Sequence, residues 1–274
     1  MLAGAGVFAE EASGRFGLTP LASTLQTNTP DSVRDWALFI AAPPVWAAWG
    51  NLLHSVQTGE SAFEHTFGMR LFSYMTDHPE LGAAYNNWMA KQSELQNGAV
   101  LASYDFSVHH KVVDVGGGQG ATLASIVQAY PQVTGVLFDL PQVVNKATFP
   151  ETIEQRCEIV PGDMLQSVPA GGDAYLLKRV LMDWSDELAT KALMNCRAAV
   201  VEHGKVLVIE PILPEGNEPS VSKFLDMTML VMQGGGRVRT EGEHRALFEA
   251  AGLELTRIIP TSSPLRLIEG APQV

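Results

Sequence analysis

The second half of the chain alternates between short β-rich runs and stretches with helical spacing, and this alternation constrains the fold more than any other feature. Helical spacing occurs at 120–131, 186–200, 220–233 and 242–252. The β-rich runs lie at 111–116, 133–140, 157–163, 174–181, 205–213, 254–260 and 265–272. Strands separated by helices imply a parallel sheet with helices on both faces. We therefore predict an α/β fold for this half.

The last two β-rich runs are joined without a helix. Only residues 261–264 lie between them, so the two strands should pair as an antiparallel hairpin. A Rossmann-like sheet of seven strands that ends in such a hairpin is typical of methyltransferases, whereas dinucleotide dehydrogenases are usually parallel throughout. The order of elements thus favours the methyltransferase architecture.

The first part of the chain is mostly helical in pattern, which divides the protein into an N-terminal region, 1–108, and a second region, 109–274. Within the first, residues 7–19 alternate around a central turn as a β-hairpin does. Thr19 followed by Pro20 then predicts a helix start. A short hairpin beside helices indicates the wing of a winged-helix unit. Because this region is not basic, we expect it to serve packing or dimerisation rather than DNA binding.

The composition excludes several classes of protein. A formal net charge of −12 argues against a nucleic-acid partner. No segment approaches the roughly 20 apolar residues of a membrane span, and the first residues lack the basic start of a signal peptide. Cys157 and Cys196 stand in unrelated contexts, so neither a disulfide framework nor a metal site is expected. These features predict a cytoplasmic globular protein with no membrane partner and no metal.

A glycine-rich turn, VVDVGGGQGA at 112–121, leaves the first β-rich run and enters a helix. Glycines at such a turn let the backbone approach a ligand closely. The motif alone is ambiguous, because Gly116, Gly118 and Ala121 also satisfy the spacing of NAD sites. Asp139, at the end of the next run, would grip a ribose diol in either case.

Two further acidic residues distinguish a SAM site from an NAD site. Asp114 lies inside the glycine motif and Asp163 follows the third β-rich run, and NAD binding explains neither. S-adenosylmethionine (SAM) has no pyrophosphate but carries a ribose, an adenine and a cationic methionyl end. An acid on each of three successive strand ends suits that ligand better, so we expect SAM as the cofactor.

Several motifs in one order and spacing make a family resemblance plain: DVGGGQG, FDLPQVV, GDM, LLKRVLMDWSDE, IEPILP and the GG-x-x-RT-x-x-E segment. From about Leu2 to Pro272 the chain resembles the plant-type small-molecule O-methyltransferases, also called caffeate or hydroxyindole O-methyltransferase-like. The resemblance implies SAM as methyl donor and S-adenosylhomocysteine (SAH) as product. It also implies a homodimer, and several helices ahead of the segment that starts here at Met1.

The resemblance further implies which residues bind SAM. Two glycines would approach the methionyl part, one acid would bind the ribose, the GDM turn would hold the adenine, and a lysine would close the site. These cofactor-binding positions are Gly116, Gly118, Asp139, Leu140, Asp163, Met164 and Lys178.

The catalytic pattern of the family is broken in this chain. In the family, a histidine before D-W-S-D-E takes the proton from the acceptor hydroxyl, and two glutamates orient it. Here the first glutamate is Glu210, but Met182 stands at the histidine position and Val238 at the second glutamate position. A thioether accepts no proton at neutral pH. The two losses are coherent, because an acid without the base it orients would be a buried charge without a partner.

Three interpretations follow from this loss. The protein transfers methyl groups by proximity alone to an acceptor that is already ionised, such as an acidic phenol, enol or carboxylate. Alternatively, SAM is a structural cofactor for a hydroxylation, a decarboxylation or a pericyclic rearrangement. Finally, the protein is an inactive binding or dimerisation partner. Intact SAM-binding positions favour the first interpretation over the last.

Side chains from the N-terminal helical region and from the α/β region should together form the acceptor pocket. His54 and His65 are candidate substitute bases, although a lone histidine is more often a packing residue, and Asp183 is expected to serve local structure. An excess of methionine and aromatic side chains suits a flat, apolar acceptor, such as an aromatic or polyketide-like secondary metabolite. The expected pocket walls are Tyr85, Met89, Trp184, Met229 and Gln233.

Overall fold

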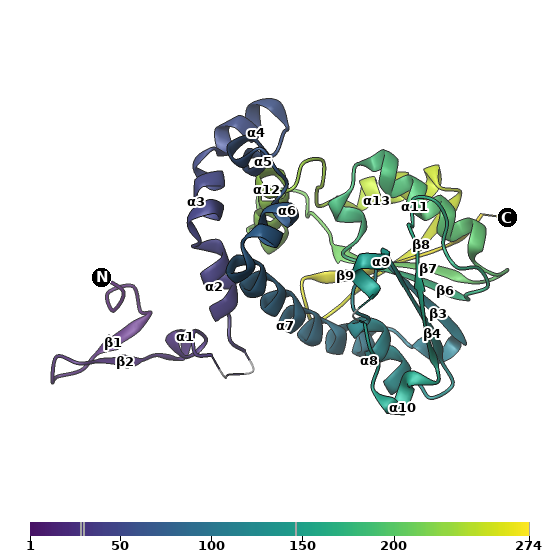
Figure 1. Cartoon of the computed structure of the whole chain (residues 1–274), viewed down its shortest axis with the longest axis horizontal. Helices are drawn as coiled ribbons and strands as arrows, with labels where there is room; N and C mark the ends of the chain where they lie inside the picture. The colour runs from purple at the N-terminus through teal and green to yellow at the C-terminus, as the bar shows by residue number, and fades with distance from the viewer. Residues whose placement is uncertain (28, 30, 146, 274) are drawn as a thin grey trace.

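The computed structural model describes residues 1–27, 29, 31–145 and 147–273, and its centre is a mixed β-sheet (Figure 1). Within these residues seven strands form the sheet in the order β5-β4-β3-β6-β7-β9-β8. The predicted seven-stranded Rossmann-like sheet is therefore confirmed. The strands are β3 (Lys111–Val115), β4 (Thr134–Asp139), β5 (Cys157–Pro161), β6 (Ala174–Lys178), β7 (Lys205–Pro211), β8 (Leu253–Pro260) and β9 (Leu265–Pro272).

The terminal hairpin is antiparallel, as predicted, and its second strand, not its first, pairs with the rest of the sheet. β9 pairs antiparallel with β8 and also with β7, so the last strand lies between them. The other neighbouring strands are parallel. β3 pairs with β4 on one side and β6 on the other, which makes its carboxyl end the point where strand order reverses. Open α/β sheets bind their ligands at that point.

Helices cover both faces of the sheet (Figure 1). On one face α11 (Asp186–Ala199) and α13 (Glu241–Ala250) pack through Leu193 and Phe248, both fully buried. The other face is covered by the end of α7 (Pro79–Ser103) and by α8 (Ala121–Ala129), α9 (Pro141–Val144) and α10 (Glu151–Glu154). Each strand places alternate apolar side chains into the two cores, which is the pattern of a sheet buried on both sides.

The predicted N-terminal hairpin is present and stands apart from the body of the molecule (Figure 1). β1 (Phe8–Glu10) and β2 (Phe16–Leu18) pair antiparallel around a turn in which Gly14 has a φ of 75°. α1 (Pro20–Ser23) follows, and the Thr19 hydroxyl accepts a hydrogen bond from the Ala22 amide at 3.2 Å. The predicted helix start at Thr19 and Pro20 is thus confirmed.

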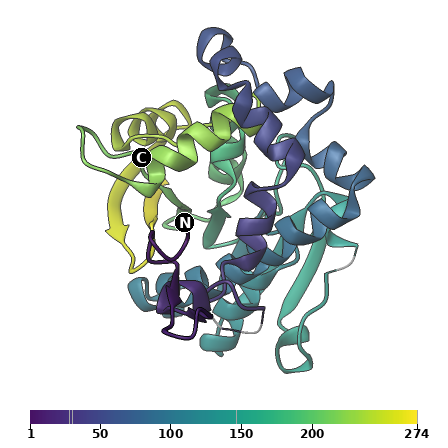
Figure 2. The same ribbon diagram turned by 90° about the vertical axis from the view of Figure 1, so that its left-hand side faces the viewer.

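A helical layer lies beside the sheet, and one helix from the second half of the chain enters it. α12 (Val221–Met232) packs among α3, α4 and α5, far from it in sequence (Figure 2). Its buried end joins Phe39, Phe63 and Leu71 in one apolar core. The helices of this layer are α2 (Arg34–Ile40), α3 (Pro43–Gly50), α4 (Leu52–Thr58), α5 (Ala62–Phe67), α6 (Leu71–Asp77) and α7.

The apolar face of α12 does not form solid core along its whole length. Met229 and Met232 are buried, but Val221 is 67% and Phe224 50% exposed. Phe224 stacks on Trp49 with the ring centroids 5.7 Å apart. This face therefore lines a cavity, which the helical spacing alone did not indicate. Among the described residues no helix has the length and apolar character needed to span a membrane.

Candidate functional site

A cleft of about 330 Å³ opens at the carboxyl ends of the central strands. It lies at the reversal of strand order, where α/β folds bind ligands. The structure brings five of the seven predicted cofactor residues to its wall, together with the side of Trp184. These five are Gly116, Asp139, Leu140, Asp163 and Met164.

Asp139 is held rigidly in this cleft by the backbone on either side. One carboxylate oxygen accepts a hydrogen bond from the Gly118 amide at 2.8 Å, and the other accepts one from the Leu140 amide at 2.7 Å. Gly118 does not line the cleft, but with a φ of 63° it aims its amide at Asp139. Each carboxylate oxygen keeps a second lone pair, which is what two hydroxyls of a ribose require.

The glycines of the cleft are required by close packing. A Cβ on Gly116 would lie 2.8 Å from a methyl of Val180, and one on Gly162 would lie 2.4 Å from the ring of Phe138. Beyond Gly162, Asp163 accepts a hydrogen bond from the Leu165 amide at 2.9 Å, which fixes the turn. The acidic ends of β4 and β5 and the open space between them fit a nucleoside with a free diol.

Lys178 lies behind the glycine turn and not in the wall of the cleft. Its ammonium donates hydrogen bonds to Asn97 at 2.8 Å and to Thr122 at 3.4 Å. Burial lowers the pKa of Lys178 to about 8, although nearby Asp114 opposes the change. Asp114 is itself buried, without a hydrogen-bond partner among the described residues, and burial raises its pKa to about 7. The role of Lys178 in closing the site stays a prediction.

A second cavity, of about 230 Å³, lies between α7, α12 and the sheet edge. Four of the five predicted acceptor-pocket residues line it: Tyr85, Met89, Met229 and Gln233. The fifth, Trp184, lines the cofactor cleft instead. Burial raises the pKa of Tyr85 to about 12, so its hydroxyl stays protonated at neutral pH. The sequence did not single out Trp36, Phe39, Trp88 or Arg179, which also line this cavity.

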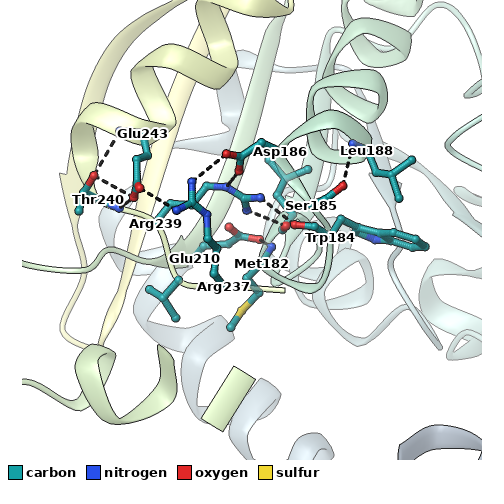
Figure 3. Close-up of polar contacts among 12 residues, drawn as sticks. Met182, Trp184, Ser185, Asp186, Leu188, Glu210, Arg237, Arg239, Thr240 and Glu243 are labelled. Atoms are coloured by element: carbon teal, nitrogen blue, oxygen red, sulfur yellow. Dashed lines mark hydrogen bonds and ion pairs between the residues drawn. The ribbon is translucent and has the colours of Figure 1, made fainter. Parts of the chain in front are cut away.

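Met182 and Val238, the positions at which the family resemblance predicts a catalytic histidine and a second glutamate, lie together. Both are buried, and with Met229 they form one apolar cluster. Glu210 is buried beneath them and accepts a hydrogen bond from the Met182 amide at 2.9 Å (Figure 3). Burial raises the pKa of Glu210 to about 7, while that amide and Arg239 lower it. The trio is therefore assembled in space, with two of its members apolar.

Arg239 anchors this region, and the sequence analysis missed it. Its side chain is 1% exposed and donates hydrogen bonds to the carbonyl oxygens of Leu181 at 2.8 Å and Trp184 at 2.7 Å (Figure 3). It also pairs with Asp186 at 2.9 Å. Leu181 begins the 3₁₀ turn η2 (Leu181–Asp183) and Trp184 follows it, so Arg239 holds both ends of the turn that carries Met182. Only the RT pair in the GG-x-x-RT motif signals this role in the sequence.

The two candidate histidine bases lie away from both cavities. His54 and His65 stack on each other with ring centroids 3.8 Å apart, and His54 lies 3.5 Å from Glu60. Neither is among the residues that line the cleft or the acceptor cavity, as far as the chain is described. Whether either acts as a base stays a prediction.

Asp183 lines the cofactor cleft, beside Met182 in sequence. Burial raises the pKa of its carboxyl to about 6, and Arg179 opposes the change. An acid with such a pKa in the wall of this cleft is a candidate proton acceptor, because its ionisation lies close to neutral pH. The sequence predicted a local structural role for Asp183 and not this one.

Comparison with known proteins assigns the family. A model of the O-methyltransferase domain matches residues 49–254. The chain belongs to this O-methyltransferase family. A phenazine O-methyltransferase of Lysobacter antibioticus is 42% identical over 274 residues, which cover 99% of this chain and 80% of the relative. A 3-amino-4-hydroxybenzoate 4-O-methyltransferase of Streptomyces cremeus is 39% identical over 262 residues, 94% of this chain and 70% of the relative.

A solved O-methyltransferase from neocarzinostatin biosynthesis contains SAM and 2-hydroxy-5-methyl naphthoic acid. It superposes with a TM-score of 0.83 at 28% identity, covering 99% of this chain and 82% of its own. The present enzyme is thus a SAM-dependent O-methyltransferase. That the cleft around Asp139 binds the SAM nucleoside stays a prediction. The expectation of SAM over NAD is confirmed, and the comparisons favour methyl transfer over the non-methylating alternatives.

Replacing Asp139 by asparagine should weaken SAM and SAH binding about 10–100-fold, because hydrogen bonds to a charged acceptor contribute about 1.5–3 kcal/mol. The asparagine side chain would also have one oxygen in place of the two carboxylate oxygens that accept hydrogen bonds from the Gly118 and Leu140 amides. Titration calorimetry with SAH measures the change. Asp105→Asn is the matched control, since Asp105 also accepts a backbone amide, that of Ser107, outside the cleft. Equal SAH affinity in Asp139→Asn and wild type would contradict the assignment.

Proposed function

We propose that this enzyme methylates a hydroxyl of a small aromatic or polyketide-like secondary metabolite, and that it does so by proximity without a general base at position 182. The observation that carries the proposal is the apolar cluster of Met182, Val238 and Met229 at the place of the family's base. A buried thioether and a buried isopropyl group neither accept a proton nor orient a group that does.

The acceptor cavity supports an aromatic substrate. Trp36 and Trp88 stack with ring centroids 5.5 Å apart, and Phe39 lies 5.2 Å from Tyr85. Aromatic and methionine walls with few polar groups suit a flat ring system. Two of the relatives are named for such acceptors, a phenazine and a hydroxybenzoate. The acceptor of the present enzyme belongs to the same chemical class, phenolic rings that fit a cavity of about 230 Å³.

SAM supplies an activated methyl group on a cationic sulfur. Asp139, Asp163 and Gly116 would hold the cofactor in the cleft, and the walls from α7 and α12 would hold the acceptor in the second cavity. Orientation of two reactants in this way supplies several kcal/mol through effective molarity. The acceptor oxygen forms a bond to the methyl carbon as the carbon–sulfur bond breaks, which leaves neutral SAH. The acceptor must therefore bring its oxygen as the anion.

A product assay tests this proposal. The enzyme is incubated with SAM and phenols of graded acidity, and mass spectrometry detects the methylated product and SAH. We expect methylation of acidic phenols at neutral pH and slow methylation of weakly acidic ones. Binding of SAM without any methylated phenol across the panel would reject methylation of phenols and revive the non-methylating interpretation.

The same proposal assigns residues 1–108 to dimerisation and to the cap of the acceptor cavity, and residues 109–274 to SAM binding. The projecting hairpin and α1 carry apolar side chains that the described residues leave exposed: Phe16 is 64%, Leu18 54% and Leu21 58% exposed. A second copy of the chain is the partner that would bury them. Light scattering should give the mass of a homodimer, and Phe16→Ser with Leu18→Ser should give a monomer. A monomeric wild type would contradict the assignment.

A further inference from the structure

Arg179 occupies a special place between the two cavities. It is the one residue with an ionisable charged side chain among the described residues that line the acceptor cavity, and it also lines the cofactor cleft. It follows β6 directly, with a φ of 55°, in the left-handed region that side chains other than glycine rarely adopt. Its amide donates to the Ile209 carbonyl oxygen at 3.0 Å. Strained backbone that a fold retains is a reason to look for a function.

The guanidinium of Arg179 has no fixed partner in the described part of the chain. The structure gives it neither a hydrogen bond nor an ion pair there, whereas the side chain of Arg239 makes three such contacts, to Leu181, Trp184 and Asp186. The side chain is half-buried. A guanidinium offers five donors in a planar fork that matches an anionic oxygen, and an unpaired one in a largely apolar cavity is poised for such a ligand.

Four ionisable groups surround Arg179. Asp183 lies on the turn η2 and Asp139 at the end of β4, both in the cofactor cleft with it. Lys178 precedes it in β6, and Tyr85 faces it from α7 across the acceptor cavity. Both carboxylates line the cofactor cleft, and the charge of Arg179 acts on Asp183 there. The described residues that line the acceptor cavity include no carboxylate.

We propose that Arg179 binds the acceptor's reacting oxygen and holds it as the phenolate at the junction of the two cavities. This inference rests on the proposed function and extends it, because it gives the base-free site a way to obtain an ionised acceptor. The proton leaves to solvent before methyl transfer, and the cation stabilises the charge that remains. Arg179 thereby does by electrostatics what a histidine at position 182 would do by proton transfer.

A chromophoric phenol reports this charge directly, without methyl transfer. The probe is 4-nitrophenol bound to the enzyme in the presence of SAH, which has no sulfonium charge, and its phenolate absorbance is followed against pH. An adjacent cation lowers the pKa of a neighbouring acid by about 1–3 pH units. We expect a decrease of this size in wild type, its loss in Arg179→Gln, and its partial retention in Arg179→Lys.

The matched control is Arg245→Gln, which removes an exposed arginine paired with Glu241 on α13. It should leave the probe's ionisation unchanged. An unchanged probe pKa in Arg179→Gln, a bound probe no more acidic than the free one in wild type, or no binding of 4-nitrophenol at all would each overturn the inference. A lowered probe pKa in an enzyme that gives no methylated product would reject the proposed function and leave the anion site in place.

Discussion

Replacing Met182 by histidine together with Val238 by glutamate should raise the rate of methylation of weakly acidic phenols by about 10²–10⁴-fold, the usual contribution of a general base. The two substituted side chains would enter one cluster, next to Glu210. The imidazole would then have two carboxyl groups to orient it. Acceptors that are already ionised have no proton to give up, so their rates should stay nearly constant.

Two control variants show whether the gain depends on the complete trio. Met182→His alone should give a small gain, because Val238 leaves the ring without its second carboxyl partner. Met182→His with Val238→Gln matches the double variant in size and lacks the charge. Initial rates on a series of phenols of graded acidity measure all four proteins. An equal gain for ionised and weakly acidic phenols would show that the double variant acts through packing and not as a base.

Arg239→Met should lower the free energy of unfolding by about 2–5 kcal/mol, because each hydrogen-bonding group left buried without its partner costs about 1–3 kcal/mol. The change leaves the carbonyl oxygens of Leu181 and Trp184 without their donors and Asp186 without its buried partner. Because those carbonyls lie at the two ends of η2, the variant molecules that remain folded should also lose methyl transfer, even at a saturating SAM concentration.

Urea unfolding measures the change in stability, with Arg245→Met as the control for losing an arginine that is exposed. Arg237 also contacts Asp186, at 2.7 Å, so Arg237→Met separates loss of the exposed ion pair from loss of the buried contacts. Its effect should be about 1 kcal/mol or less, as for surface ion pairs. A similarly small effect of Arg239→Met would contradict the anchoring role.

The sheet and its hairpin were predictable because their signals are local. The β-rich runs at 111–116 and 174–181 predict strands wherever they pack. Only four residues join the last two runs, and so short a connection allows antiparallel but not parallel pairing. The position of α12 was not predictable, since its entry into the N-terminal helical layer depends on contacts with residues about 170 positions away, such as the Ser61 hydroxyl on the Val231 carbonyl.

The candidate site divides along the same line. Asp139 and Gly116 lie in short motifs whose strand–turn–helix geometry is set locally, so the sequence places them at the cleft. The RT pair marks Arg239 in the sequence but does not name its partners, which lie on and after the turn η2. Arg179 carries no motif signal, and its place at both cavities depends on the folded structure. Trp184 was expected in the acceptor cavity, but the turn η2 presents it to the cofactor cleft. The sequence spacing did not specify which way that turn faces.

The pH dependence of methyl transfer in the wild-type enzyme tests the absence of a protein base most directly. Initial rates are measured from pH 5 to 9 at saturating SAM for phenols of graded acidity, in wild type and in Asp183→Asn. We predict a rise whose midpoint moves with the acidity of each phenol, in both proteins. A midpoint fixed near pH 6 for every phenol, and lost in Asp183→Asn, would show that Asp183, with its raised pKa of about 6, takes the proton. That result would contradict base-free transfer.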